Sequence, residues 1–294
     1  MGRRSGAHRA RRVVLGVFGV LAAFALWEGY KALGRATDDK IGPVRLPATT
    51  DDLAMPHVWT IGQRFLEREV RGSNRTVAQV VLEGMWFTFR VAMTGFVVGV
   101  LVGLALAVLM QRFHLAERSL LPFVILSQTV PLVALAPLVV GWGGQLEVFG
   151  REWEPWMSVA VISAYLAFFP VAVGALRGLQ SPSRASEELM ESYAASHRQT
   201  LRVMRFPAAV PYLVPALKLA AAAAVVGAIV AEISTGTRGG IGRLIIEYAR
   251  QGTSDPVKVF TAIIGAAALG LVVAGLVALF DTYAMRNRPR EVRS

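Results

Sequence analysis

Side chains suited to ionic and hydrogen-bonding contacts gather between residues 181 and 207 of a chain that is otherwise mostly apolar. Ser181 is followed by proline, a pairing typical of a helix start, and the glutamates after it suit the positive end of a helix dipole. Ser196 stands three residues before Gln199, the spacing of a capping box, so residues 194–196 are expected to form a tight corner. The sequence therefore predicts two short helices joined by a corner, and residues 181–207 are called the elbow below.

Residue types needed for catalysis or metal binding form no recognisable pattern. The chain has no cysteine, which excludes a thiol nucleophile and a cysteine metal site. None of its lysines follows a glycine, so it has no phosphate-binding G-K-[S/T] sequence. Its histidines lie outside the apolar runs, and neither H-E-x-x-H nor G-x-S-x-G occurs. We expect no catalytic residue, no metal site and no cofactor bound by this chain, and a membrane-embedded enzyme is the least favoured alternative.

The apolar runs predict an all-α integral membrane protein. Apolar residues make up 54% of the 294-residue chain, and glycine and proline are spread through the apolar parts. About 20 helical residues cross a bilayer core of roughly 30 Å. Six runs are candidates for crossings: residues 13–27, 91–110, 119–146, 155–176, 206–231 and 259–280. A secretory signal peptide is the competing interpretation of residues 1–35, but the following residues offer a poor cleavage site.

Charge distribution predicts the orientation of the chain. With the N-terminus in the cytoplasm, almost the whole net charge of +11 falls on the cytoplasmic side, as the positive-inside rule expects. Both termini and the elbow are then cytoplasmic. Basic residues are scattered at span ends, which favours lipid as a partner and argues against nucleic acid. The predicted parts are a basic N-terminus (1–12), a first span (13–33), an external loop with an amphipathic helix at about 60–71 (34–83), a core (84–285) that includes the elbow, and a tail (286–294).

The third apolar run holds prolines that predict a break. Pro131 and Pro137 each remove a backbone hydrogen bond, and the freed groups need partners or a water-lined path. Ser127, Gln128 and Thr129 stand just before the first break, where transporters commonly place substrate contacts or gates. Alternatively, Gln128 hydrogen-bonds across a helix interface. We keep both interpretations, and Ser127, Gln128, Thr129 and Pro131 are the candidate substrate-pathway residues.

Few other residues of the spans stand out. Gly95, Gly99 and Gly103 lie four residues apart and form a small-residue stripe for helix packing. Arg90 and Lys218 are expected to reach toward the interface, although Arg90 could attract an anion. The spans as drawn contain no acidic residue, which argues against a stand-alone secondary transporter coupled to an ion.

A glycine-rich stretch follows the fifth run. Gly236, Gly239, Gly240 and Gly242 predict turns before an amphipathic helix that includes Leu244 and Tyr248. We expect a surface or re-entrant helix on the outer side that can cap the exit of a pathway.

These features together resemble the transmembrane permease subunits of bacterial binding-protein-dependent ABC importers of type I. Such permeases carry a cytoplasmic loop with the pattern Glu-Ala-Ala, three residues, Gly, nine residues, Ile, one residue, Leu-Pro. The pattern falls on Glu188, Leu189, Met190, Ala194, Met204, Phe206 and Pro207, of which the glutamate and the proline match outright. The resemblance covers roughly residues 13–285, with stretches such as PLVALAPLVVGWGG and AEISTGTRGGIGRLI. It is similar to the branch that imports nitrate, sulfonates, taurine and thiamine-pyrimidine or flavin precursors.

The resemblance implies a mechanism and a set of partners. Two permeases, either two copies or a copy and a paralogue, dock on two ATPases that bind ATP and Mg²⁺, and an extracytoplasmic binding protein delivers the solute. SQTVPLVALAPL favours a heteroaromatic precursor as substrate, with nitrate, sulfonate or taurine as the alternative. Arg205 completes an arginine row with Arg198 and Arg202. The residues expected to couple to the ATPase are Glu188, Leu189, Met190, Tyr193, Ala194, Ala195, Ser196, Arg198, Leu201, Arg202 and Pro207.

Overall fold

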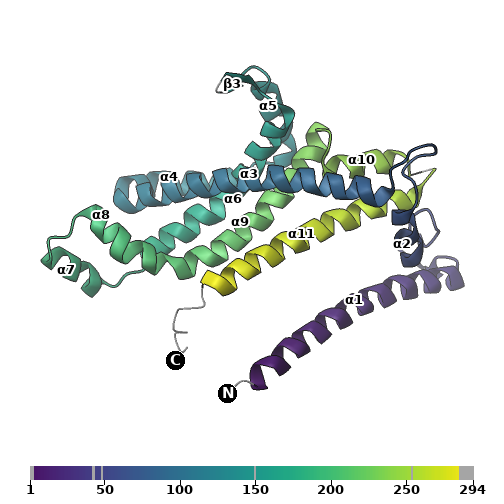
Figure 1. Cartoon of the computed structure of the whole chain (residues 1–294), viewed down its shortest axis with the longest axis horizontal. Helices are drawn as coiled ribbons and strands as arrows, with labels where there is room; N and C mark the ends of the chain where they lie inside the picture. Colours follow the sequence, from purple (N-terminus) through teal and green to yellow (C-terminus); the bar gives the residue numbers. More distant parts are fainter. Residues whose placement is uncertain (1–2, 42–43, 48, 149, 253, 285–294) are drawn as a thin grey trace. The chain divides into compact units, whose positions relative to one another are not determined.

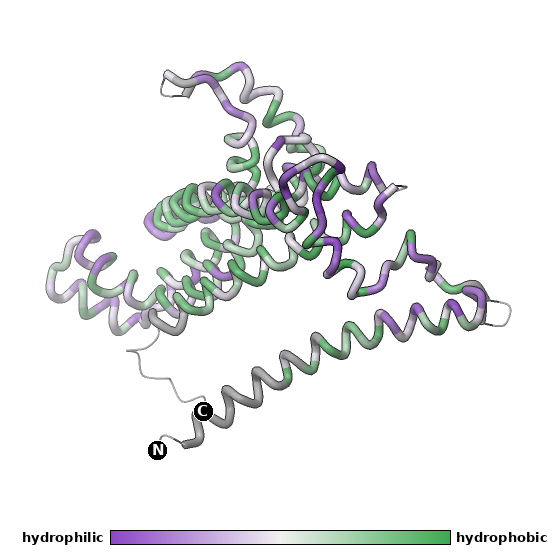
Figure 2. Tube along the Cα trace, turned by 45° about the vertical axis from the view of Figure 1, so that its right-hand side comes forward, coloured by the Kyte–Doolittle hydropathy of each residue, from purple (hydrophilic) through white to green (hydrophobic). Residues whose placement is uncertain are grey.

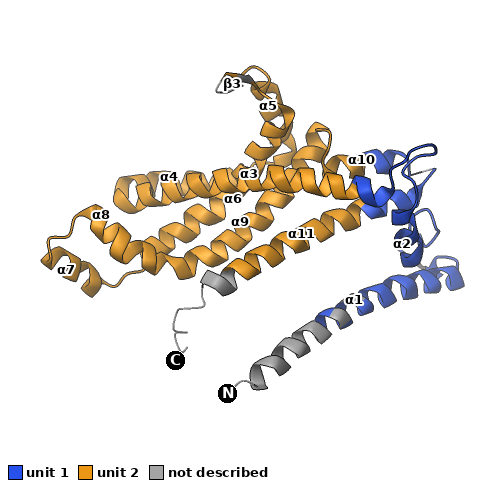
Figure 3. Ribbon diagram, in the orientation of Figure 1, with its two compact units in different colours: residues 1–80, 247–261 blue, residues 81–246, 262–294 orange. Residues whose placement is uncertain are grey.

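The computed structural model describes residues 3–41, 44–47, 49–148, 150–252 and 254–284, so the predicted tail 286–294 lies outside the described residues. The regular elements of the described chain are helices and two short pairs of two-residue strands, joined by turns and irregular segments (Figure 1). It divides into two compact units, residues 1–80 with 247–261 and residues 81–246 with 262–294 (Figure 3). The elements are α1 (Arg3–Thr37), β1 (Lys40–Ile41), β2 (Val44–Arg45), α2 (Val58–Leu66), α3 (Val77–Arg112), α4 (His114–Ser127), α5 (Leu132–Gly143), β3 (Glu147–Val148), β4 (Arg151–Glu152), α6 (Pro155–Leu179), α7 (Arg184–Ser192), α8 (His197–Thr200), the π-helix η1 (Leu201–Arg205), α9 (Phe206–Thr235), α10 (Ile241–Arg250) and α11 (Pro256–Ala284).

The core of the larger unit is built on α6, which packs closely on both α3 and α9. On the α3 side, a Cβ added to Gly99 would lie 2.8 Å from the carbonyl oxygen of Ala164, and Gly95 and Gly103 face the same helix. On the α9 side, a Cβ added to Gly178 would lie 2.8 Å from the Cα of Ala209. Small residues therefore let the three backbones approach, which is how membrane helices gain packing contacts.

Four described helices are long and apolar enough to cross a membrane: α3, α6, the continuous stretch His197–Thr235, and α11. α4 and α5 would add a fifth crossing if they form one broken span, since they are bent by 102° across a short gap. Figure 2 shows hydrophobic residues along the long helices of this unit and hydrophilic ones gathered at α7 and α8. α1 contains the predicted first span but is not among these helices, a count that covers the described residues only, so the sixth crossing stays a prediction.

In the smaller unit, side-chain hydrogen bonds connect the C-terminal half of α1 to the segment after the first hairpin. Lys31 is buried and donates to Asp52 Oδ1 at 2.6 Å and to the carbonyl of Met55. Glu28 accepts from the amide of Val58 at 2.9 Å, at the start of α2. α1 is therefore held by side-chain hydrogen bonds to residues 52–58.

α2 is shorter than the predicted helix at 60–71, because the chain after Leu66 becomes extended and pairs with the segment before α3. The amide of Val77 donates to the carbonyl of Glu67 at 3.0 Å, and Arg68 and Thr76 form an antiparallel bridge. Ile61 of α2 is buried, and Leu66 at its end is exposed.

Candidate functional site

The first half of the elbow is α7, whose start differs in detail from the prediction. Ser183, not Ser181, is the N-cap, and its side chain accepts from the amide of Ser186 at 3.3 Å. Ser181 instead donates to the carbonyl of Gly178 at the end of α6, because it belongs to that helix's C-terminal turn. The proline after Ser181 therefore lies in the link between α6 and α7, outside α7.

The corner after α7 is a Schellman turn with alanine at its left-handed position. Ala194 has φ of +49°. Its amide donates to the carbonyl of Glu191 at 2.8 Å, and the amide of Ala195 donates to that of Met190 at 3.0 Å. Glycine usually occupies this position because it has no Cβ penalty, and the family pattern places glycine here. The turn thus satisfies the last carbonyls of α7 at a conformational cost.

The second half of the elbow begins with the predicted capping box. The amide of Ser196 donates to Gln199 Oε1 at 2.8 Å, and the amide of Gln199 donates to Ser196 Oγ at 3.4 Å, which confirms the spacing argument. α8 then continues through η1 into α9 without a break, so no helix boundary separates the elbow from α9. Pro207 has no amide to donate within this continuous helix. It directly follows the widened turn of η1, in which the amide of Phe206 donates to the carbonyl of Leu201.

Two elbow residues pack against other parts of the same chain. Arg205 is only 15% exposed; its Nη2 lies 2.7 Å from Glu187 Oε1, and its Nη1 donates to the carbonyl of Leu179 at 3.0 Å. Arg205 therefore fastens α7 and the end of α6 to η1, which corrects its place in the expected docking row. Leu201 is half-buried against the cluster that contains Met110 and Leu176, so it anchors the elbow internally.

The remaining predicted coupling residues form the outer surface of the elbow. Leu189 is 56% exposed and Tyr193 is 76% exposed, although both are large apolar side chains. Val203, which the sequence analysis missed, is 69% exposed and stands beside Arg202. Glu188, Ala194, Ser196, Arg198, Arg202 and Pro207 are exposed, and Met190 and Ala195 are half-buried. In the sequence, Val203 could have been recognised as an apolar residue among the arginines of the second helix.

The predicted pathway residues lie at the sharp bend between α4 and α5. The hydroxyls of Ser127 and Thr129 donate back to α4 carbonyls, those of Val124 and Leu126. Gln128 donates to Ser127 Oγ at 3.2 Å, not across a helix interface, and the cross-helix bond is made by Tyr165 of α6 to the carbonyl of Ser127. Pro131 is the N-cap of α5. Pro137 lies inside α5 without breaking it, so only the first of the two expected breaks occurs.

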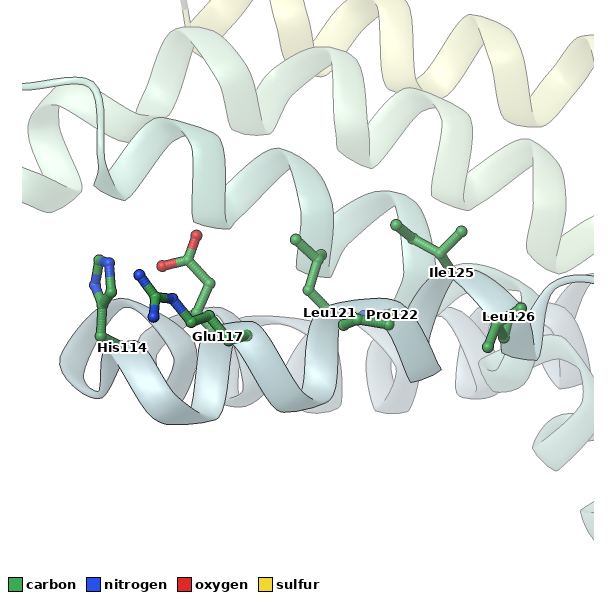
Figure 4. Close-up of a pocket in the computed structure, with 7 residues that line it drawn as sticks. His114, Glu117, Leu121, Pro122, Ile125 and Leu126 are labelled. Carbon is green, nitrogen blue, oxygen red and sulfur yellow. The ribbon is translucent and has the colours of Figure 1, made fainter.

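A hollow of about 570 Å³ lies on α4, the helix before this bend. Figure 4 shows His114 and Glu117 toward one end of it and Ile125 and Leu126 toward the other. All of its lining residues come from α4, so it is an open surface groove and not an enclosed substrate cavity.

A buried acidic residue stands at the end of α9, where the sequence analysis expected none. Glu232 has no exposed surface and lies in the last turn of the helix, one residue beyond the apolar run that ended at 231. The run was cut at its first charge, and the helix continues to Thr235. The absence of an acidic residue was therefore not a sound argument against ion coupling.

Comparison with known proteins identifies the family to which this helical protein belongs. Residues 95–284 match the family described as the binding-protein-dependent transport system inner membrane component. The chain belongs to this family. The matched region contains α6, the whole elbow, α9, α10 and α11.

Relatives of this permease are named for several solutes. It is similar to the formylaminopyrimidine transport permease protein ThiX of Halalkalibacterium halodurans, with 31% identity over 62% of this chain and 71% of that protein. It is similar to the putative aliphatic sulfonates transport permease protein SsuC of Bacillus subtilis, with 29% identity over 72% of this chain and 75% of that protein. A crystal structure of an amino acid ABC transporter with histidines has a TM-score of 0.54 at 22% identity, covering 70% of this chain and 94% of that chain, and shows the type I fold.

The chain is thus a membrane permease subunit of an ABC importer, in the branch that includes the sulfonate, taurine and thiamine-precursor permeases. It is a transport subunit and not an enzyme, and ATP hydrolysis lies in a partner ATPase. Family membership also implies a solute-binding protein as a partner.

Proposed function

We propose that the elbow is the surface through which this permease is driven by its ATPase. The observation that carries the proposal is the exposure of Leu189, Tyr193 and Val203 on a rigid, doubly capped elbow. Large apolar side chains exposed beside charged ones mark a protein interaction site. Glu188, Arg198 and Arg202 are exposed on the same segment and supply oriented polar contacts.

The elbow is built to pass motion into the membrane helices. α8, η1 and α9 form one continuous helix, and Arg205 ties η1 to α7 and α6. A displacement of the elbow is therefore carried into α9 instead of being absorbed by a flexible joint. Such coupling requires contacts that differ between two states of the ATPase.

The functional assembly contains two permeases, two ATPases that bind ATP and Mg²⁺, and an extracytoplasmic binding protein. The second permease is another copy of this chain or a paralogue, and this chain binds no cofactor itself. Both termini and the elbow face the cytoplasm of a bacterial inner membrane, because almost the whole net charge of +11 falls on that side. Anionic lipid surrounds these basic span ends.

The substrate is a small heteroaromatic precursor of the thiamine-pyrimidine or flavin type. Relatives named for formylaminopyrimidine and riboflavin support this choice, each with 31% identity to this chain. Import of a sulfonate, taurine or nitrate is the alternative, supported by the relatives named for aliphatic sulfonates and taurine. The polar groups at the bend, Ser127, Gln128, Thr129 and Pro131, are the candidate contacts along the pathway.

Co-purification with candidate ATPases tests the elbow. Glu188→Ala and Tyr193→Ala are expected to weaken capture of the ATPase and to lower transport-coupled ATP hydrolysis. Arg177→Ala is the matched control, since Arg177 is exposed at the end of α6, just before the elbow. If both elbow variants retain full capture and coupling, the elbow is not the driving surface.

The substrate is tested through the partner binding protein. Its affinity for pyrimidines, flavins, sulfonates, taurine and nitrate is measured by calorimetry. Binding restricted to the anions would replace the heteroaromatic proposal with the alternative.

A further inference from the structure

Glu232 is an acidic side chain that is buried inside the protein. It has no exposed surface, although charged groups inside membrane proteins are costly and are usually retained for a purpose. Thr88 of α3 donates its hydroxyl to the carboxylate, at 2.8 Å from Oε1 and 3.0 Å from Oε2. The amide of Gly242, in the first turn of α10, donates to Oε2 at 2.9 Å. One carboxylate thus links α3, α9 and the start of α10.

Thr88 also binds the start of α10 directly. It is fully buried, and its hydroxyl oxygen accepts from the amide of Ile241 at 2.9 Å. The first two amides of α10 are therefore both held by this pair of side chains. These amides have no partner within their own helix, so a carboxylate and a hydroxyl there satisfy groups that would otherwise be orphaned.

The loop before α10 is shaped around the carboxylate. Any Cβ at Gly240 would collide with the Glu232 carboxyl group, and a Cβ at Gly242 would lie 2.5 Å from the carbonyl oxygen of Ile229. Only glycine permits this close approach at Gly240. The glycines that predict turns in the sequence thus also make room for a buried acid.

We infer that Glu232 and Thr88 form a latch that fixes the start of α10 to α3 and α9, and that transport requires the latch. The inference rests on the proposed transport function, and Glu232 acts as a positioning residue. With the latch made, α10 moves together with the ends of α3 and α9. With the latch broken, the start of α10 moves independently, and motion delivered through α9 no longer carries it.

Amide hydrogen exchange of the full chain in lipid nanodiscs tests the contact itself. Thr88→Val removes the hydroxyl, and Glu232→Gln replaces one carboxylate oxygen with a nitrogen that accepts no hydrogen bond. Each is expected to speed exchange in residues 236–246 about tenfold, because Thr88→Val leaves the amide of Ile241 without its acceptor and Glu232→Gln removes one of the two oxygens that accept from Thr88 and Gly242. Thr88→Ser keeps the hydroxyl and is expected to restore slow exchange. Thr94→Val is the matched control on α3, since Thr94 is exposed and donates to the carbonyl of Arg90.

Transport by the assembled complex, with its ATPase and binding protein, tests the role. We expect Thr88→Val to lower solute moved per ATP hydrolysed about tenfold, the factor expected when one buried hydrogen bond is lost, while Thr88→Ser restores it and assembly is unchanged. Fast exchange with normal transport would make the latch merely structural and overturn the inference, as would unchanged exchange in both Thr88→Val and Glu232→Gln. A wild-type complex that moves no solute contradicts the proposed function instead, and the exchange data still decide whether the latch exists.

Discussion

Replacing Ala194 by glycine should strengthen the corner of the elbow, although glycine normally weakens local structure. Ala194 has φ of +49°, where an L-residue with a Cβ pays about 1–2 kcal/mol. Glycine escapes this cost but adds about 0.4–1 kcal/mol of chain entropy in the unfolded corner. The difference is a gain of about 0.5–1 kcal/mol, which corresponds to about two- to fivefold slower exchange of the corner amides.

The assay is hydrogen exchange of the amides of Ala194 and Ala195, read in a peptide that covers the corner. Ala194→Pro supplies the opposite perturbation, because proline fixes φ near −65° and removes the amide that donates to Glu191. That variant should cost about 3 kcal/mol or more, and it should lose ATPase capture as well. Ala185→Gly is the matched control: Ala185 lies in the first turn of α7, so the same change should weaken that helix, by at most about 0.5–1 kcal/mol.

The opposite signs expected at Ala194 and Ala185 make the reasoning refutable. Faster exchange at the corner in Ala194→Gly would show that the left-handed conformation carries no strain. Equal effects of glycine at both positions would show that the measurement reports general loosening of the elbow and not its corner.

Three further predictions concern other parts of the chain. Gly99→Leu should lower stability by at least about 1–3 kcal/mol by driving α3 from α6. Gly270→Ala, in open space within α11, should instead raise stability by about 0.5–1 kcal/mol; thermal unfolding in detergent measures both. Arg205→Ala should destabilise the elbow by about 1–3 kcal/mol, while Arg202→Ala should leave its protease resistance intact and weaken ATPase binding. The hydrogen bond from Lys31 holds the pKa of Asp52 below its usual range. The Lys31–Asp52 hydrogen bond therefore stabilises the fold above the usual pKa of Asp, and this stabilisation is lost as pH falls through the lowered pKa. Amide exchange in residues 50–58 should rise over that pH range in the wild type and not in Asp52→Asn.

Local capping rules predicted the elbow well where their partners are neighbours in sequence. Ser196 and Gln199 lie three residues apart, and the capping box formed as expected. The same rules misplaced the first N-cap, because Ser181 could serve either the end of α6 or the start of the next helix. The structure shows that it bonds the carbonyl of Gly178, which is a matter of how α6 ends and not of the sequence after it.

Features that depend on tertiary contacts could not be predicted from the sequence. Arg205 looks like its neighbours Arg198 and Arg202, and only the position of Glu187 and the end of α6 turns it inward. Glu232 was left out because a charge seemed to end the apolar run, yet Thr88, from a helix distant in sequence, makes its burial possible. A hydropathy pattern cannot register a donor supplied by another helix.

α9 connects the two regions on which the proposals rest. The elbow lies at its start and Glu232 in its last turn, and its 30 residues correspond to about 45 Å of helix. Its prolines, Pro207, Pro211 and Pro215, all fall in the first third, so the part that packs on α6 near Gly227 has an unbroken hydrogen-bond ladder. Motion that enters at the elbow therefore reaches the start of α10 as a movement of the stiff end of α9, provided that Glu232 holds the two together.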